Sequence, residues 1–123
     1  MPMNIQLGEI LAWRVWRVDP NGVLWSFNHE CLWPTGIMSG DDPFDSDRVG
    51  LWAMKSVAAL DGFGCCPTPL ALGAVSIWGN VAEHTAGYRA QFARVASIDQ
   101  IRPADDVLLD AVRRRYGVDG SSK

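Results

Sequence analysis

The chain has 123 residues, of which 48% are hydrophobic and 20% are charged, and its net charge is −3. This composition excludes a disordered chain and predicts one domain, residues 1–118, that folds without a disulfide or a metal ion. A weakly acidic chain also argues against nucleic acid as the main partner, because nucleic-acid-binding proteins usually present a basic face to the phosphates.

The N-terminal residues lack the charged and apolar regions of a signal peptide, and no apolar run approaches the roughly 18 residues of a membrane span. The odd number of cysteines (Cys31, Cys65 and Cys66) fits a reducing compartment. We therefore expect a cytoplasmic protein that contacts no membrane.

The first half of the chain predicts a β-hairpin. Aromatic and β-branched residues dominate 11–18 and favour a strand, and 23–27 forms the returning strand. Asp19-Pro20-Asn21-Gly22 between them is typical of a turn, because Pro fixes φ and Asn-Gly tolerates positive φ. Residues 28–48 are rich in Gly, Pro and Asp and indicate an irregular excursion over the surface.

Further strands are expected at 50–55, 71–84 and 88–99. Gly79 lies inside the second of these and indicates a β-bulge or a close backbone approach. Thr85-Ala86-Gly87 resembles a three-residue hairpin loop whose last residue is left-handed. In that register Glu83 faces Arg89, and His84 stands beside Tyr88 on the other side of the sheet.

A helix over 105–116 is expected to close the fold. Asp105 and Asp106 match the positive end of its dipole, the arginines 113–115 match the negative end, and Gly117 suits a left-handed stop. Residues 119–123 should form a flexible tail. These elements predict an α+β fold: a twisted antiparallel sheet of about five strands, or a half-open barrel, covered by the C-terminal helix.

Two motifs resemble those of a family of small uncharacterised actinobacterial proteins with no known activity. Residues 50–55 (Gly-Leu-Trp-Ala-Met-Lys) are similar to that family's Gly-Ile-Tyr-Ala-x-Lys, and residues 78–90 carry Trp-Gly-x-Val-x-Glu-His-x-x-Gly-Tyr-Arg-Ala. The resemblance covers about half of the chain and implies a common fold. Where members of the family often have Cys-x-Cys, this chain has Asp47 and Val49.

The residues around the second hairpin tip are candidates for a small polar site. His84 is a candidate general acid or base together with Glu83, because an imidazole titrates near neutral pH. Arg89 is suited to binding a carboxylate or phosphate, and Tyr88 to donating a hydrogen bond. The structural alternative is a Glu83–Arg89 ion pair and a packed Tyr88–His84 pair.

We expect no metal ion and no cofactor. His29, Cys31 and the adjacent cysteines Cys65 and Cys66 offer zinc-ligand types, but their spacing does not match the usual Cys-x(2–4)-Cys. The Asp-rich segment 41–47 lacks the ligand spacing of a calcium-binding EF-hand.

Six tryptophans are more than a small core easily buries. The leading hypothesis is a non-enzymatic binding or accessory domain with a groove or interface lined by Trp16, Trp25 and Trp33, with a protein or small-molecule partner.

The first alternative is a small transferase or hydrolase that uses His84 with Glu83 or Arg89. The second is a DNA-contacting accessory protein that uses Arg113 and Arg114. Homodimerisation is compatible with each of them.

Overall fold

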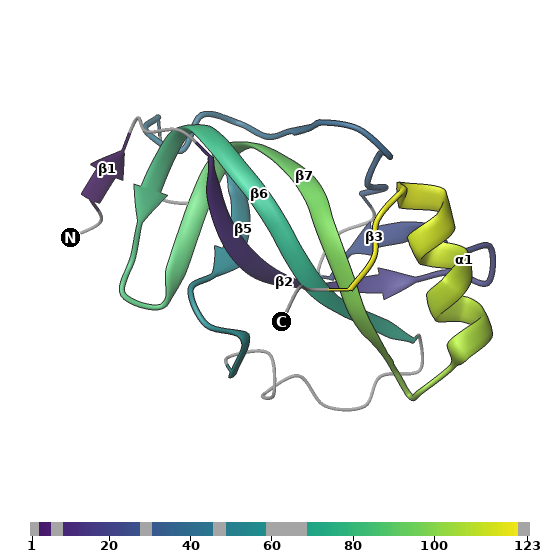
Figure 1. The fold of residues 1–123 in the computed structure, drawn as a ribbon. Helices are drawn as coiled ribbons and strands as arrows, with labels where there is room; N and C mark the ends of the chain where they lie inside the picture. Colours follow the sequence, from purple (N-terminus) through teal and green to yellow (C-terminus); the bar gives the residue numbers. More distant parts are fainter. Residues whose placement is uncertain (1–2, 6–8, 28–30, 46–48, 59–68, 121–123) are drawn as a thin grey trace.

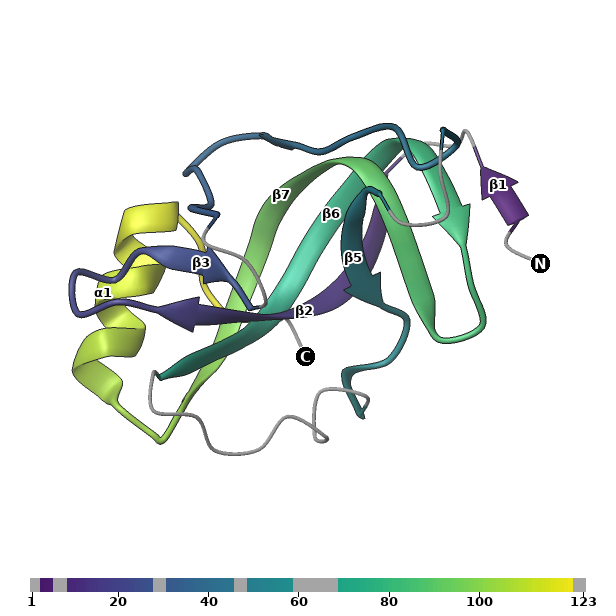
Figure 2. The same ribbon diagram turned by 180° about the vertical axis from the view of Figure 1, so that it is seen from behind.

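The computed structural model describes residues 3–5, 9–27, 31–45, 49–58 and 69–120. Within them the chain forms one antiparallel sheet and one C-terminal helix, which confirms the α+β class (Figures 1 and 2). The elements are β1 (Met3–Ile5), β2 (Ile10–Val18), β3 (Leu24–Ser26), β4 (Met38–Ser39), β5 (Leu51–Met54), β6 (Leu70–Glu83), β7 (Gly87–Arg102) and α1 (Asp106–Tyr116).

The five expected strands correspond to β2, β3, β5, β6 and β7, and the short strands β1 and β4 join the sheet through β6 and β7. The long β6–β7 hairpin crosses the molecule, with α1 at one end and β1 at the other (Figure 1). β2 pairs with β6, and β5 pairs with β7. The sheet bends until β2 also meets β5, but in the described residues these two strands share only the pair Trp13–Met54. The sheet is therefore strongly curved but not closed into a barrel.

The first hairpin turns as expected. Gly22 adopts a φ of 80°, the left-handed region that glycine tolerates best. The Asp19 carboxylate accepts hydrogen bonds from the backbone N–H groups of Asn21 (2.8 Å) and Val23 (3.1 Å). The turn thus supplies its own side-chain acceptor, as Asx turns do.

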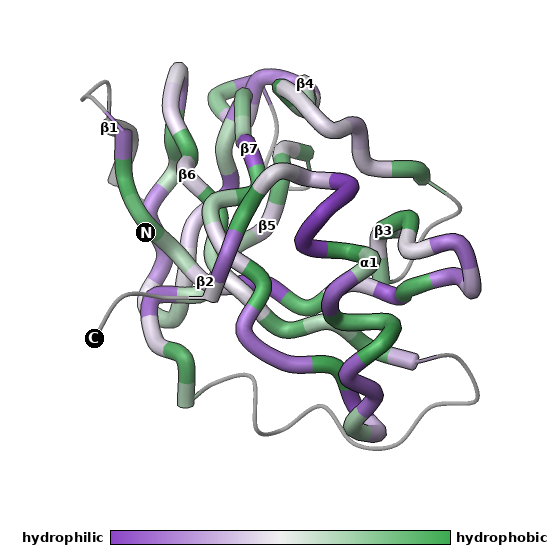
Figure 3. Tube along the Cα trace, turned by 45° about the vertical axis from the view of Figure 1, so that its right-hand side comes forward, coloured by the Kyte–Doolittle hydropathy of each residue, from purple (hydrophilic) through white to green (hydrophobic). Residues whose placement is uncertain are grey.

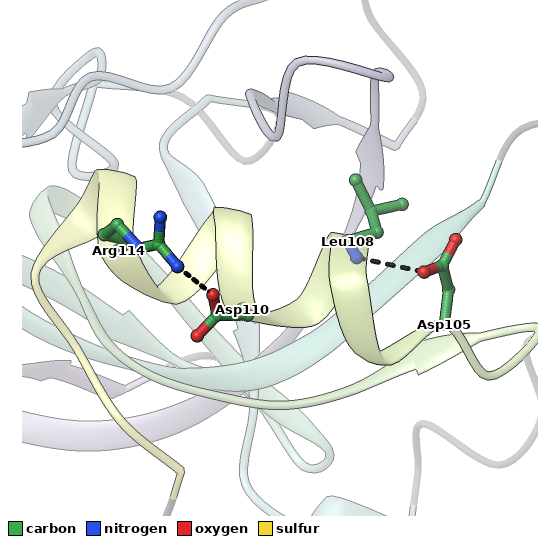
Figure 4. A network of polar contacts seen from close by, with 4 residues as sticks. All are labelled: Asp105, Leu108, Asp110 and Arg114. Atoms are coloured by element: carbon green, nitrogen blue, oxygen red, sulfur yellow. Dashed lines mark hydrogen bonds and ion pairs between the residues drawn. The ribbon is translucent and has the colours of Figure 1, made fainter.

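The helix begins and ends where its capping residues lie. The Asp105 side chain accepts a hydrogen bond from Leu108 N (3.0 Å), as Figure 4 shows. Gly117 is left-handed with a φ of 66°. Hydrophobic and hydrophilic residues alternate along α1 (Figure 3), which places Val112 and Tyr116 in the core. The Tyr116 hydroxyl accepts from Leu24 N (2.9 Å) and donates to the Trp33 carbonyl (2.7 Å), so it fixes the helix to two other segments.

The predicted register of the β6–β7 hairpin is wrong by one residue. Glu83 pairs with Tyr88 and Ala82 pairs with Arg89, and a hydrogen bond from His84 N to the Gly87 carbonyl (2.8 Å) leaves a two-residue turn. Gly87 is not left-handed. A Cβ atom at Gly87 would lie 2.3 Å from the Ala53 carbonyl oxygen, so this glycine is needed for the close approach of β5 and not for the turn.

Two further predictions concern β6 and the C-terminus. Gly79 has a φ of 81° at a register shift between Trp78 and Val81, which confirms the expected bulge. In the predicted tail, the Asp119 carbonyl accepts a hydrogen bond from Ile98 N (3.0 Å), and residues 121–123 lie outside the described part. Among the described residues, no helix has the length and apolar character needed to cross a bilayer.

Candidate functional site

The observed register places His84 and Arg89 on the same face of the sheet. The sequence predicts them on opposite faces. Arg89 Nε donates a hydrogen bond to His84 Nε2 (2.8 Å), and Nη1 donates to the Val49 carbonyl (2.6 Å). The Arg89 side chain is only 1% exposed. A buried guanidinium with these contacts fixes the position of the imidazole.

Trp52 lies over this pair. It is the β5 partner of Arg89, so its side chain extends from the same face of the sheet. Its ring stacks on the His84 ring with centroids 5.1 Å apart and planes 30° apart, yet 44% of the residue remains exposed. We call Trp52, His84 and Arg89 the Trp52 platform: an exposed indole supported by an imidazole that a buried guanidinium holds.

The Arg89 contact also limits the chemistry of His84. A guanidinium has only donors, so Nε2 of His84 must be the unprotonated, accepting nitrogen of the ring. Proton transfer to Nε2 during catalysis would break the hydrogen bond with Arg89. The geometry therefore suits a positioned ring better than a proton shuttle at this atom.

Glu83 and Tyr88 belong to a different group. They pair across the hairpin on the face opposite to His84. Glu83 forms an ion pair with Lys55, whose Nζ lies 5.5 Å from the centre of the Tyr88 ring. The predicted Glu83–Arg89 and Tyr88–His84 pairs are both wrong. The observed register differs from the predicted one by one residue, so Arg89 lies on the face of His84 and Tyr88 lies on the face of Glu83.

The predicted tryptophan groove is not supported for two of its three residues. Trp16 and Trp33 are 0% and 1% exposed and pack edge to face in the core, with ring centroids 5.5 Å apart. Trp25 is half-buried, and its Nε1 donates to Asp19 Oδ2 (3.1 Å). The exposed indole is that of Trp52, which sequence reasoning did not select.

Sequence reasoning also missed Arg14. On β2 it shares the inward face with Ala12 and Trp16, both 0% exposed. Burial lowers the pKa of Arg14 to about 10, and Cys31 opposes this effect. The available indication was a charged residue in an otherwise apolar alternation.

The remaining predicted sites give no cluster in the described residues. His29, Glu30, Cys65 and Cys66 lie outside them, and inside them no three His, Cys, Asp or Glu side chains gather as metal ligands would. The helix-end arginines have intramolecular partners: Arg113 donates to the Ile98 carbonyl, Arg114 pairs with Asp110 (Figure 4), and Arg115 donates to the Asn21 carbonyl.

Comparison with protein-family models, curated proteins and solved structures gave no match. The resemblance to the actinobacterial family therefore stays a prediction, and the functional argument depends on the geometry of the site.

Proposed function

We propose that this protein is a non-enzymatic binding domain whose contact surface centres on the Trp52 platform. The observation that carries the proposal is an indole that is 44% exposed and at the same time stacked on His84. Tryptophan is enriched among the residues that dominate binding energy, and a side chain held in place before binding loses little conformational entropy when a partner arrives.

The chemistry of the platform favours a flat or apolar group as the contacting part of the partner. An indole face stacks on aromatic rings or packs on aliphatic groups. Lys55, the residue after β5, and Glu83 on β6 form an ion pair on the opposite face of the same hairpin, so the platform itself contributes no carboxylate. A protein side chain and a small molecule both provide such a group, so the proposal defines the partner by its chemistry, an aromatic or aliphatic moiety.

The transferase or hydrolase alternative is less well supported. Its best argument is the 2.8 Å contact between His84 and Arg89. Against it, that contact occupies Nε2 of His84, Arg89 is almost fully buried, and Glu83 lies on the other face. The DNA-contacting alternative is weakened by the intramolecular partners of Arg113 and Arg114.

The proposal is tested with protein labelled with 5-fluorotryptophan and titrated with a library of aromatic and aliphatic fragments, observed by ¹⁹F NMR. We expect bound fragments to shift the Trp52 resonance, which the Trp52→Phe variant identifies. Trp52→Ala should weaken binding about 30-fold, the effect of losing roughly 2 kcal/mol at an aromatic anchor.

Trp78→Phe is the matched control, because Trp78 is also stacked on a ring, that of Phe92, with centroids 6.0 Å apart. It should leave fragment affinity unchanged. Fragments that bind Trp52→Ala as tightly as the natural protein would refute the proposal.

A further inference from the structure

Arg14 has an unusual environment for a charged side chain. It lies on the inward face of β2 between two residues that are 0% exposed, Ala12 and Trp16. Burying a guanidinium costs free energy unless hydrogen bonds and an opposite charge compensate for it. The contacts of Arg14 therefore show which of these compensating interactions the described residues supply.

These contacts are all with neutral groups. Nη1 donates to the Trp52 carbonyl (2.5 Å), Nη2 lies 3.4 Å from Ser26 Oγ, and the guanidinium carbon lies 4.6 Å from the centre of the Trp33 ring. Arg14 makes no ion pair with any described carboxylate. Its positive charge thus lacks a carboxylate counter-charge in the described part of the chain.

Two buried N–H groups on the same face of β2 also lack a hydrogen-bond acceptor. Among the described residues, Arg14 Nε and Trp16 Nε1 are the buried side-chain nitrogens without a hydrogen-bond partner. Both side chains extend from the same face of β2, and both contact Trp33. The ring of Trp33 offers Trp16 only a weak π acceptor, and buried donors of this kind normally have a partner.

The surrounding side chains add further donors. Ser26 pairs with Trp16 across β2 and β3. The hydrogen bond from Ser26 N to the Cys31 carbonyl and the adjacent Trp25–Leu32 bridge place Cys31 opposite Ser26, on the same inward face. A hydroxyl and a thiol therefore accompany the guanidinium and the indole N–H.

We propose that Arg14 Nε and Trp16 Nε1, with the Ser26 hydroxyl, form a binding site for a small monovalent anion, a carboxylate or a halide. One negative charge balances one guanidinium, and the acceptor atoms of the anion satisfy both N–H groups. Arg14 as a whole keeps intermediate exposure although its Nε is buried, so part of its side chain is open to the solvent. The Arg14–Trp52 hydrogen bond makes this site a neighbour of the Trp52 platform, but the inference does not depend on the platform's function.

The test is a titration of ¹⁵N-labelled protein with sodium formate and, separately, with sodium bromide. Two-dimensional NMR resolves the arginine Nε–H and tryptophan Nε1–H resonances. We expect saturable shifts of the Arg14 and Trp16 resonances, because an N–H group that gains an acceptor moves downfield. Saturation with formate alone assigns a carboxylate site, and saturation with bromide alone assigns a halide site.

Arg14→Lys keeps the charge but lacks the Nε–H group, and it should weaken binding at least tenfold. Arg94→Lys is the matched control on an exposed arginine, and it should bind as the natural protein does. The inference is overturned if neither salt gives a saturable shift at Arg14, or if all arginine resonances shift alike. Both of these outcomes are measured on the natural protein, so the test remains valid even if Arg14→Lys does not fold.

Discussion

Arg89 illustrates how one buried side chain organises the candidate site. It is 1% exposed and donates to His84 Nε2 and the Val49 carbonyl. Arg89→Ala leaves both acceptors without this donor and creates a cavity, so we expect the free energy of unfolding to fall by roughly 3 kcal/mol. Urea denaturation measures the change.

The control for this variant is Arg94→Ala on the same strand. Arg94 is exposed and lies 3.7 Å from Glu9 in a surface ion pair, so its removal should change stability by less than about 1 kcal/mol. Equal losses in the two variants would show that Arg89 does not have the structural role assigned to it.

Asp19 provides a prediction about pH. Burial raises the pKa of this carboxyl, but hydrogen bonds from Trp25 Nε1 and the backbone N–H groups of Val23 and Asn21, with the charge of Arg115, outweigh it and hold the pKa below its ordinary value. A lowered pKa stabilises the fold above the ordinary carboxyl pKa of about 3.9, and this contribution is lost as the pH falls through the folded value.

We therefore expect the stability difference between the natural protein and Asp19→Asn to be largest near neutral pH and to shrink as the pH falls below about 4. Urea denaturation over a series of pH values tests it. A difference that stays constant down to pH about 2, below the range in which an ordinary carboxyl titrates, would contradict the assigned hydrogen bonds.

At the scale of elements, Tyr116 connects α1 to the sheet through one hydroxyl. It accepts from Leu24 N and donates to the Trp33 carbonyl, both in the buried core. Tyr116→Phe leaves two buried backbone groups without a partner, so stability should fall by about 2 kcal/mol. Val107→Ala on the same helix, at a residue that is 82% exposed, should be nearly neutral. Comparable losses in both variants would contradict the anchoring role.

Local patterns were sufficient to predict the elements but not the site. Alternation identified the long strands, and the acidic residues Asp105 and Asp106 together with Gly117 identified the ends of the helix, because these depend on neighbours along the chain. The register at Gly87 depends on the approach of Ala53 from another strand, which no local pattern contains. The faces of His84 and Arg89 follow from that register, so their contact was not predictable.

The exposure of the tryptophans also depends on contacts between segments that are distant along the chain. The composition indicated that not every indole would be buried, but it could not identify the exposed one. Trp33 lies outside the named strands and is nevertheless buried, because its carbonyl and ring meet Tyr116 and Trp16. Trp52 is in a regular strand and is nevertheless exposed.

For the whole molecule, the core unites the helix and the curved sheet. Val112 and Tyr116 of α1 pack in the same cluster as Trp16, Trp33 and strands β6 and β7. A small domain with one continuous core normally unfolds in a single cooperative step. We therefore expect two urea unfolding curves to coincide. One is recorded by tryptophan fluorescence, to which the buried Trp16 and Trp33 contribute, and the other by circular dichroism at 222 nm, to which α1 contributes.

Tyr116→Phe makes this test sharper. If helix and sheet unfold together, the variant lowers the midpoints of both curves by the same amount, because its lost hydrogen bonds weaken a single folded unit. If the circular dichroism curve moves while the fluorescence curve does not, α1 unfolds separately and the chain is not one cooperative domain. The natural protein and Val107→Ala serve as the references for both curves.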